Sequence, residues 1–333
     1  MSEQRYRLFD PVLGENDAVA MQRLCERFGT YSMYSQEAAE AEIGQGLAQR
    51  HDAVMNFLKT GGRQGKPAPV EELVARTNYF REEYAYGEQV KIEGIEPFLH
   101  HRGFVDAARA IHGREVIEPA IVYANILVAG QELAVHTDVP EFRGANRKKY
   151  PQWLMVVMHH SGLFDAWRMP IVTAVSWFNE CRGGAFVYYP EGASGRAAAL
   201  PAKPNSAIVL DTDSVFHGVD PVAPGEPVAP LKPGMRLVFD GDGRWSIRAG
   251  DEVVARYGWN DIRFSISWKA YCFADEAERR AWREHSDDLD LDGIVDRLVE
   301  DLRERGRLAG ERPAPTDLAL MMIDEYVKFP AAA

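Results

Sequence analysis

The sequence predicts a mainly β fold with helices at both ends of the chain. Between residues 116 and 273, short runs of β-branched and aromatic residues alternate with turns, whereas the flanking segments have helical patterns. Many short strands at close spacing are typical of a β-sandwich or a barrel and not of alternating β-α-β units. A hydrophobic share of 46% in 333 residues is enough for a substantial core.

The N-terminal region, residues 1–115, is expected to be helical and to pack on the β-rich core. Apolar residues within 16–28 recur at spacings of two to four, as they do in an amphipathic helix. Residues 36–60 are rich in Ala, Glu, Gln and Leu, which favours helix formation. We expect further helices over residues 69–83 and 95–112.

The core is expected to span residues 116–273 and to contain inserted hairpins at about 223–260. A stretch rich in Pro and Gly opens this insertion, and Asp240–Gly243 has the composition of a hairpin turn. After residue 273 the patterns are helical again, so a helical C-terminal region is expected over residues 274–333. The runs expected to form strands are 116–128, 153–158, 171–178, 185–190, 206–211, 236–240, 245–250, 252–258 and 263–273.

Composition and charge exclude several classes of protein. With 38 basic and 50 acidic residues, the net charge of −12 disfavours a sequence-independent grip on nucleic acid, which needs a basic surface. The cysteines Cys25, Cys181 and Cys272 form no CxxC pair, so neither a zinc site nor a disulfide framework is expected. No stretch approaches the roughly eighteen consecutive apolar residues of a membrane span. A reducing, cytoplasmic location is the default expectation.

His136 and Asp138 form the most informative motif of the chain. In an extended strand, residues two apart point to the same side, so the imidazole and the carboxylate project into one space. They supply two ligands of a facial triad, which leaves three positions of an iron open for a bidentate co-substrate and oxygen. The alternative is a hydrogen-bonded pair at the end of a strand.

Two later features strengthen the metal-site interpretation. His217 opens a β-branched run 81 residues after His136 (217 − 136), which leaves room for several strands. Further on, Arg263 and Ser265 share one face of an alternating strand. An arginine that faces a β-core is costly unless an anion meets it, and a dicarboxylate co-substrate would supply that anion through a charge-assisted pair. The alternative for Arg263 alone is an edge-strand arginine that reaches solvent.

In this order, the motifs resemble the iron(II)/2-oxoglutarate-dependent dioxygenase superfamily, nearest its prolyl-hydroxylase-like branch. The supporting residues are an apolar strand that ends in Asn, residues 172–179, and a Gly-Gly turn into the next strand, residues 183–192. The resemblance covers roughly residues 116–273 and leaves both helical ends unplaced. It implies a double-stranded β-helix, or jelly-roll, core.

The resemblance also implies a set of site residues and cofactors. Iron(II) would be held by His136, Asp138 and His217, which would form the catalytic centre. The co-substrate 2-oxoglutarate would be held by Arg263 with Ser265, and O2 would be the oxidant.

Asn125 and Tyr123 are further candidates for contact with the co-substrate. Asn125 lies in an Asn-x-Leu-x-x-Gly pattern that is similar to the oxidative alkyl-nucleic-acid demethylases, where a strand asparagine touches the co-substrate. Tyr123 shares the strand face of Asn125, so either side chain could hydrogen-bond 2-oxoglutarate. The alternative is an ordinary strand residue with local partners.

The chain departs from the family pattern in one respect. His217 and Arg263 are 46 positions apart (263 − 217), which is longer than is usual in the family. An insertion in a surface loop costs little free energy, so the pattern survives. Arg236, Arg244 and Arg248 in this insertion are alternative anchors, but Arg263 is preferred because it begins an alternating polar strand followed by a strong apolar run.

A basic cluster follows the metal motif and consists of Arg143, Arg147, Lys148 and Lys149. Such a cluster could attract an anionic substrate. It could equally be a solvated lid in an acidic protein, and the solvated interpretation is preferred here.

The resemblance implies hydroxylation or desaturation of an unactivated C–H bond, with succinate and CO2 as co-products. Halogenating family members lack the carboxylate that Asp138 supplies. The expected substrate is a small molecule, such as an amino acid or a natural-product intermediate, and neither a nucleic acid nor a membrane is an expected partner. The alternatives are a macromolecule-modifying oxygenase and a non-enzymatic jelly-roll binding protein. Substrate identity and oligomeric state stay open.

Overall fold

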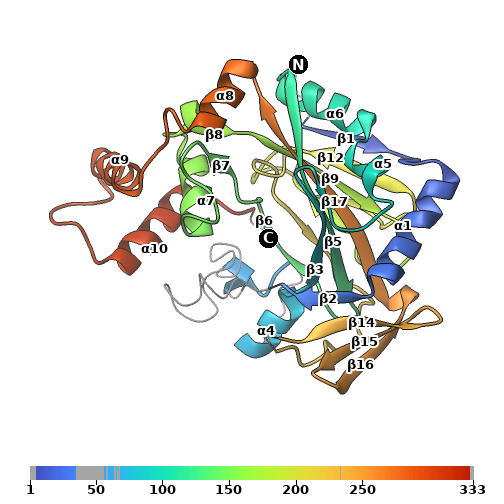
Figure 1. Ribbon diagram of the computed structural model, residues 1–333. Coiled ribbons are helices and arrows are strands. Elements are labelled where there is room, and N and C mark those ends of the chain that lie inside the picture. Colours follow the sequence, from blue (N-terminus) through green and yellow to red (C-terminus); the bar gives the residue numbers. More distant parts are fainter. Residues whose placement is uncertain are drawn as a thin grey trace.

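Two antiparallel β-sheets lie at the centre of the protein, as the computed structural model in Figure 1 shows. The structure describes residues 5–34, 56, 57, 59–63, 65, 68–232 and 234–330. Within these residues the main sheet has the strand order β1 (Tyr6–Phe9), β12 (Ser206–Leu210), β9 (Ile171–Trp177), β17 (Ile262–Phe273), β5 (Val116–Val128), β3 (Phe80–Tyr86), β2 (Thr30–Met33), β14 (Arg236–Gly241), β15 (Arg244–Ala249) and β16 (Glu252–Gly258), with β4 (Gln89–Val90) beside β3. The minor sheet has the order β11 (Ala198–Leu200), β10 (Phe186–Tyr188), β13 (His217–Val219) and β6 (Leu133–His136).

The chain alternates between these two sheets. It runs from β5 in the main sheet to β6 in the minor sheet, returns to β9, crosses to β10 and β11, returns to β12, crosses to β13 and ends in β17. The resulting orders, β12-β9-β17-β5 and β11-β10-β13-β6, are those of an eight-stranded jelly roll, the double-stranded β-helix. The expected fold class, mainly β with flanking helices, is therefore confirmed.

Three helices from the N-terminal region cover one face of the main sheet. They are α1 (Glu15–Phe28), α5 (Glu96–Leu99) and α6 (Arg102–His112), and their buried side chains join one core cluster with the strand residues Phe264 and Trp268. The helix expected over residues 16–28 is confirmed as α1. The helix expected over residues 95–112 is present as two pieces, α5 and α6.

The N-terminal region also contributes strands to the main sheet, which the sequence did not indicate. The helix expected over residues 69–83 ends early, since α4 spans Val70–Thr77 and β3 begins at Phe80. The expectation was wrong for residues 80–83 because their pairing with β5 overrides the local helical pattern. The helix expected over residues 36–60 lies outside the described residues, apart from 56, 57, 59 and 60.

The run at residues 153–158, expected to be a strand, is a helix instead. It lies within α7 (Gln152–Ser161), whose residues Leu154 to Met158 are all buried. A short run that is apolar on every side carries no period, so its sequence does not distinguish a strand from a buried helix. The helices α9 (Leu291–Glu304) and α10 (Pro315–Tyr326) pack against α7 and bury it.

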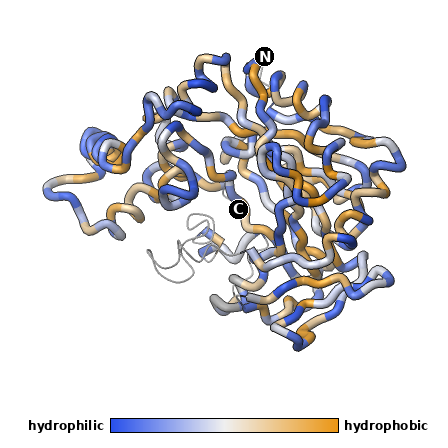
Figure 2. Tube along the Cα trace, in the orientation of Figure 1, coloured by the Kyte–Doolittle hydropathy of each residue, from blue (hydrophilic) through white to orange (hydrophobic). Residues whose placement is uncertain are grey.

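The inserted segment extends the main sheet. Strands β14, β15 and β16 form an antiparallel meander, and β14 pairs with β2. Trp245 and Ile247 of β15 are fully buried, and the Trp245 ring lies against Tyr31, Phe239 and Trp259. Figure 2 shows that hydrophobic residues run along the strands of the central sheet, whereas many residues of α9 are hydrophilic.

The C-terminal region is fastened to the loop that follows the metal motif. After α8 (Glu276–Glu284), the Leu289 amide donates to the Arg143 carbonyl at 3.0 Å, and Arg143 Nε donates to Asp287 at 2.8 Å. Gly144, with a φ of +84°, lies so close to this segment that an added Cβ would be 2.3 Å from the Leu289 nitrogen. Only glycine fits this contact. None of the helices in the described part of the chain has the length and apolarity that crossing a membrane requires.

Candidate metal centre

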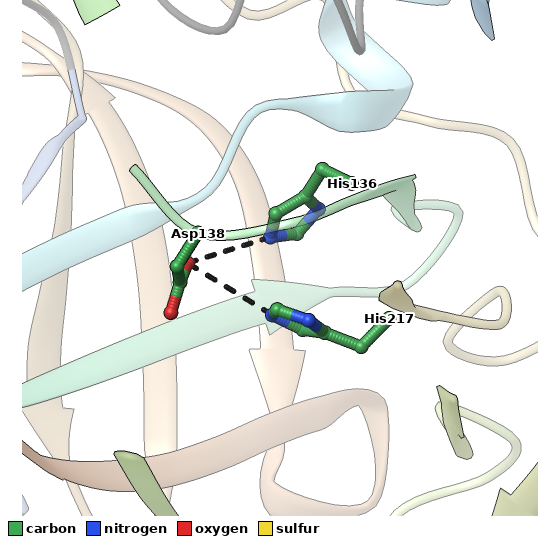
Figure 3. Close-up of side chains that lie close together, drawn as sticks. All are labelled: His136, Asp138 and His217. Atoms are coloured by element: carbon green, nitrogen blue, oxygen red, sulfur yellow. Dashed lines mark ion pairs between the residues drawn. The ribbon is translucent and has the colours of Figure 1, made fainter. Parts of the chain in front are cut away.

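The minor sheet brings His136, Asp138 and His217 together. His136 ends β6 and pairs directly with His217, which begins β13, so the two imidazoles lie side by side with centroids 4.4 Å apart. Asp138 Oδ1 lies 3.7 Å from His136 Nε2 and 3.9 Å from His217 Nε2, as Figure 3 shows. The ligand atoms of the three residues all lie within 4.8 Å of one another, and all three side chains are buried.

Backbone carbonyls orient both imidazoles. His136 Nδ1 donates to the Ala134 carbonyl at 2.6 Å, and His217 Nδ1 donates to the Val215 carbonyl at 2.9 Å. With the proton held on Nδ1, the Nε2 lone pair of each ring is directed toward the shared centre. This is the arrangement that metal-binding histidines adopt in proteins.

Lys269 orients the carboxylate. Its Nζ donates to Asp138 Oδ2 at 2.6 Å, and both side chains are buried. The other oxygen, Oδ1, is the one that lies near the two imidazoles. Lys269 was not among the residues predicted from the sequence, although it lies on the same face of β17 as Arg263 and Ser265. The alternation of that strand was the signal that could have found it.

The donor set fits a non-haem iron(II) site. Two imidazoles and one carboxylate on one side of a centre form the facial arrangement that leaves positions open for other ligands. Asp138 is further fixed by its backbone, whose amide donates to the Thr212 carbonyl at 2.8 Å.

Arg263 lies in the same cavity and carries a hydrogen-bond donor that nothing in the described residues satisfies. Its Nε donates to the Gly184 carbonyl at 2.8 Å and its Nη1 to Ser265 Oγ at 3.3 Å, while Nη2 is buried and has no partner among the described residues. Burial lowers the pKa of the Arg263 guanidinium to about 10, against the opposing effect of Cys181. The group therefore stays charged at neutral pH, and a buried charge of this kind is suited to an anionic ligand.

The alternative anchors in the insertion lie elsewhere. Arg236 and Arg244 are exposed, and Arg248 donates to Asp240 within the meander at 2.5 Å. None of the three lines the cavity around His136 and Asp138. Of the arginines weighed from the sequence, Arg263 is the one that the structure places there.

Asn125 and Tyr123 also line this cavity. In the ladder between β5 and β17, Asn125 pairs with Ser265 and Tyr123 pairs with Ser267, so their side chains share the inner face. Asn125 Oδ1 is buried without a partner among the described residues. Tyr123 is already engaged, because the guanidinium of Arg81 lies 3.7 Å above its ring.

The four residues of the basic cluster that follows the metal motif have different surroundings in the structure. Arg143 is buried and pairs with Asp287, and Lys149 Nζ donates to the Gly144 carbonyl. Arg147 and Lys148 line a second cavity, of about 750 Å³, beside the metal centre. The interpretation of the cluster as a solvated lid was therefore wrong for Arg143, because tertiary contacts bury it, whereas Arg147 is half-buried.

Comparison with known proteins gives distant structural likenesses. No protein-family model and no curated protein matches the chain. Among solved structures it is similar to a Pseudomonas putida prolyl-4-hydroxylase, at 14% identity over 81% of this chain and 94% of that one, with a TM-score of 0.40. It is also similar to a Trichoplax adhaerens prolyl hydroxylase in complex with a hypoxia-inducible-factor peptide fragment, at 11% identity over 83% and 86%, with a TM-score of 0.44.

A further similar structure is HygX from Streptomyces hygroscopicus, with nickel, 2-oxoglutarate and hygromycin B bound. Its identity to this chain is 8%, over 81% of this chain and 84% of that one, with a TM-score of 0.40. The jelly-roll assignment does not depend on these likenesses, because the strand order of the chain itself defines it.

Proposed function

We propose that this protein is an iron(II)- and 2-oxoglutarate-dependent oxygenase. One observation carries the proposal: a buried His-Asp-His cluster and the unsatisfied guanidinium nitrogen of Arg263 line the same cavity. The cluster is suited to a metal with open positions, and the guanidinium is suited to the far carboxylate of a dicarboxylic acid.

Each residue of the candidate site has a defined task in this proposal. His136, Asp138 and His217 hold the metal, and Lys269 keeps one oxygen of Asp138 directed to it. Arg263 binds and orients the co-substrate, with help from the neighbouring Ser265 and Asn125. When bound, iron(II), 2-oxoglutarate and O2 supply oxidative decarboxylation to succinate and CO2, coupled to oxidation of an unactivated C–H bond.

The proposed substrate is a small molecule, and the proposed reaction is hydroxylation or desaturation. The second cavity, of about 750 Å³, lies within the range of pockets that bind small molecules, and it shares lining residues with the metal centre. Halogenating members of the family that the sequence resembles lack the carboxylate that Asp138 would supply, so halogenation is not proposed.

Anaerobic spectroscopy tests the proposal. Adding iron(II) and 2-oxoglutarate to the protein should give a visible metal-to-ligand charge-transfer absorption, because 2-oxoglutarate chelates the metal. Asp138→Ala should abolish the absorption. Its absence from correctly folded wild-type protein would contradict the proposal.

The co-substrate anchor needs its own variant. Arg263→Met should raise the concentration of 2-oxoglutarate that half-saturates the absorption by about 10- to 100-fold, the contribution expected of hydrogen bonds to a charged group. Arg244→Met, which removes an exposed arginine of the meander, is the matched control and should leave that concentration unchanged. Equal affinities of the two variants for 2-oxoglutarate would show that Arg263 does not bind the co-substrate.

A further inference from the structure

The cavity beside the metal centre has an apolar wall and a basic end. It has a volume of about 750 Å³ and shares Tyr34, Arg81, Arg147 and Lys269 with the cavity around the metal ligands. Its apolar wall is formed by Tyr86, Pro119, Ile121, Ile171, Tyr271 and Trp282. A molecule bound here would therefore contact the aromatic rings with its body and the arginines with the end nearer the metal.

Arg81 is the first unusual feature of this cavity. Its guanidinium lies between two rings, 3.7 Å from the centroid of Tyr123 and 5.1 Å from that of Tyr34. Within the described residues no carboxylate lies within ion-pair distance of it, and its titratable neighbours are tyrosines and a second cation, Arg147. Ring faces hold a cation in place but leave its charge uncompensated.

Arg147 adds a second guanidinium at the same end. Among the described residues its one ion pair is with Glu141, at 3.8 Å, and this carboxylate also accepts a hydrogen bond from the Tyr271 hydroxyl at 2.8 Å. Among the described residues, this carboxylate pairs with Arg147 and not with Arg81.

The other carboxylates of the cavity have partners of their own. Glu83 pairs with Lys91 at 2.7 Å, and Glu118 pairs with Arg283 at 2.9 Å. The inner end of the cavity is therefore positive, although the whole chain has a net charge of −12. A positive cavity in an acidic protein concentrates anions at one place.

The two guanidiniums are separate from the anchor proposed for the co-substrate. Arg81 pairs with Asn125 across the ladder, and Asn125 pairs with Ser265, so the backbones of β3 and β17 are separated by two strand spacings, or about 10 Å. Arg263 and Ser265 therefore lie on the opposite side of β5 from Arg81. Arg81 and Arg147 are thus available to a second anion.

We infer that the substrate is a small organic acid whose carboxylate pairs with Arg81 and Arg147 while its apolar body lies against Tyr271 and Trp282. This inference rests on the proposed function, and it names the substrate class of that same site. The planar fork of an arginine matches the geometry of a carboxylate, and two such groups fix its position. The carboxylate then sets which C–H bond of the acid lies nearest the metal.

Equilibrium dialysis under anaerobic conditions tests this inference. The protein, loaded with iron(II) and 2-oxoglutarate, is dialysed against monocarboxylic acids with aryl or alkyl bodies, such as 3-phenylpropanoate and indole-3-acetate, each paired with its primary amide. At least one acid should be retained about 10- to 100-fold more strongly than its amide, as expected when a hydrogen-bonded charge is removed. Retention of no acid, or equal retention of acids and amides, would overturn the inference.

Variants test whether Arg81 and Arg147 cause the preference for acids over amides. Arg81→Met combined with Arg147→Met should abolish the preference for the acid, while Lys149→Met should preserve it. Lys149 is a matched control because it belongs to the same basic cluster but donates to the Gly144 carbonyl and does not line the cavity. A double variant that still prefers acids would overturn the inference.

The charge-transfer absorption of the same samples separates the two proposals. Absorption without a preference for acids would contradict the substrate class alone, whereas loss of absorption in wild-type protein would contradict the oxygenase itself. If the double variant lost its affinity for 2-oxoglutarate, Arg81 and Arg147 would serve the co-substrate, which would also overturn the inference.

Discussion

Lys269 Nζ donates a hydrogen bond to Asp138 Oδ2 at 2.6 Å, and this is the carboxylate oxygen that is not directed to the imidazoles. Its removal takes away a hydrogen bond that orients the carboxylate. We expect Lys269→Met to weaken metal binding about 10- to 100-fold, the usual effect of losing a partner of a metal ligand. Lys269→Arg, which keeps a donor, should recover part of that loss. Titration with manganese(II), followed by electron paramagnetic resonance, measures both, and an unchanged affinity in Lys269→Met would show that Asp138 needs no such partner.

Asp213 gives a pH-dependent prediction at the residue scale. It is fully buried, its Oδ1 has no partner among the described residues, and burial, only partly offset by Arg168, raises its pKa to about 7. Because the folded pKa lies above the unfolded value of 3.8, the stability that the protonated form contributes is present below pH 4 and is lost as the pH rises through 7.

Asp213→Asn imitates the protonated form at every pH. Relative to the wild type, it should therefore gain about 1–3 kcal/mol of stability between pH 5 and pH 8. Urea unfolding at the two pH values measures this difference, and a difference that does not change with pH would contradict the raised pKa.

At the scale of single elements, the turn before β10 lies against Arg263, the proposed co-substrate anchor. Gly184 has a φ of +65°, and an added Cβ would lie 3.0 Å from Arg263 Cδ. We expect Gly184→Ala to displace the arginine and to weaken 2-oxoglutarate binding about tenfold, or about 1.4 kcal/mol, while metal affinity stays unchanged. The charge-transfer titration reports the first and manganese binding the second. A loss of both would indicate a general disturbance of the fold.

The meander β14–β16 behaves as part of the core, in contrast to a surface loop. Trp245 is fully buried against rings from three other segments. Trp245→Ala should therefore cost about 3–5 kcal/mol of unfolding free energy, as measured by urea denaturation. Arg244→Ala, the exposed neighbour in sequence, should cost little. Similar losses for the two variants would mean that the meander is not held by this ring.

Sequence patterns predicted some elements and missed others for physical reasons. The strands around His136 and Arg263 were predictable because alternation with period two survives wherever one strand face meets a cavity. Residues 153–158 were mistaken for a strand because a helix buried on all sides has no period. Lys269 continues the alternation of Arg263 and Ser265, but its pairing with Asp138 joins segments far apart in the sequence. Arg81 was missed because its contact with Tyr123 lies between two strands of the sheet, which the pattern of one strand does not reveal.

At the scale of the whole molecule, metal binding connects the ends of two strands with the loop that follows one of them. The ligands come from the end of β6, the residues after it and the start of β13, so a bound metal holds the minor sheet together. Manganese(II) at about 100 times its dissociation constant should stabilise the fold by about 2.7 kcal/mol. A raised melting temperature, reversed by a chelator and absent in Asp138→Ala, would confirm this. The gain should fade at acidic pH, where the histidines bind protons instead of metal.

The fastening of the C-terminal segment near Gly144 has a practical consequence. The second cavity, beside the metal centre, is lined in part by Trp282, Arg283 and His285. These residues come from a part of the chain that contributes no ligand to the metal cluster. In the proposed function, these substrate-contacting residues and the metal ligands thus lie in separate segments of the polypeptide. Residues 276–285 could therefore be exchanged for other sequences while the hydrogen bond from the Leu289 amide to the Arg143 carbonyl is preserved. Such an exchange should alter which substrates the protein accepts and leave the candidate metal centre unchanged.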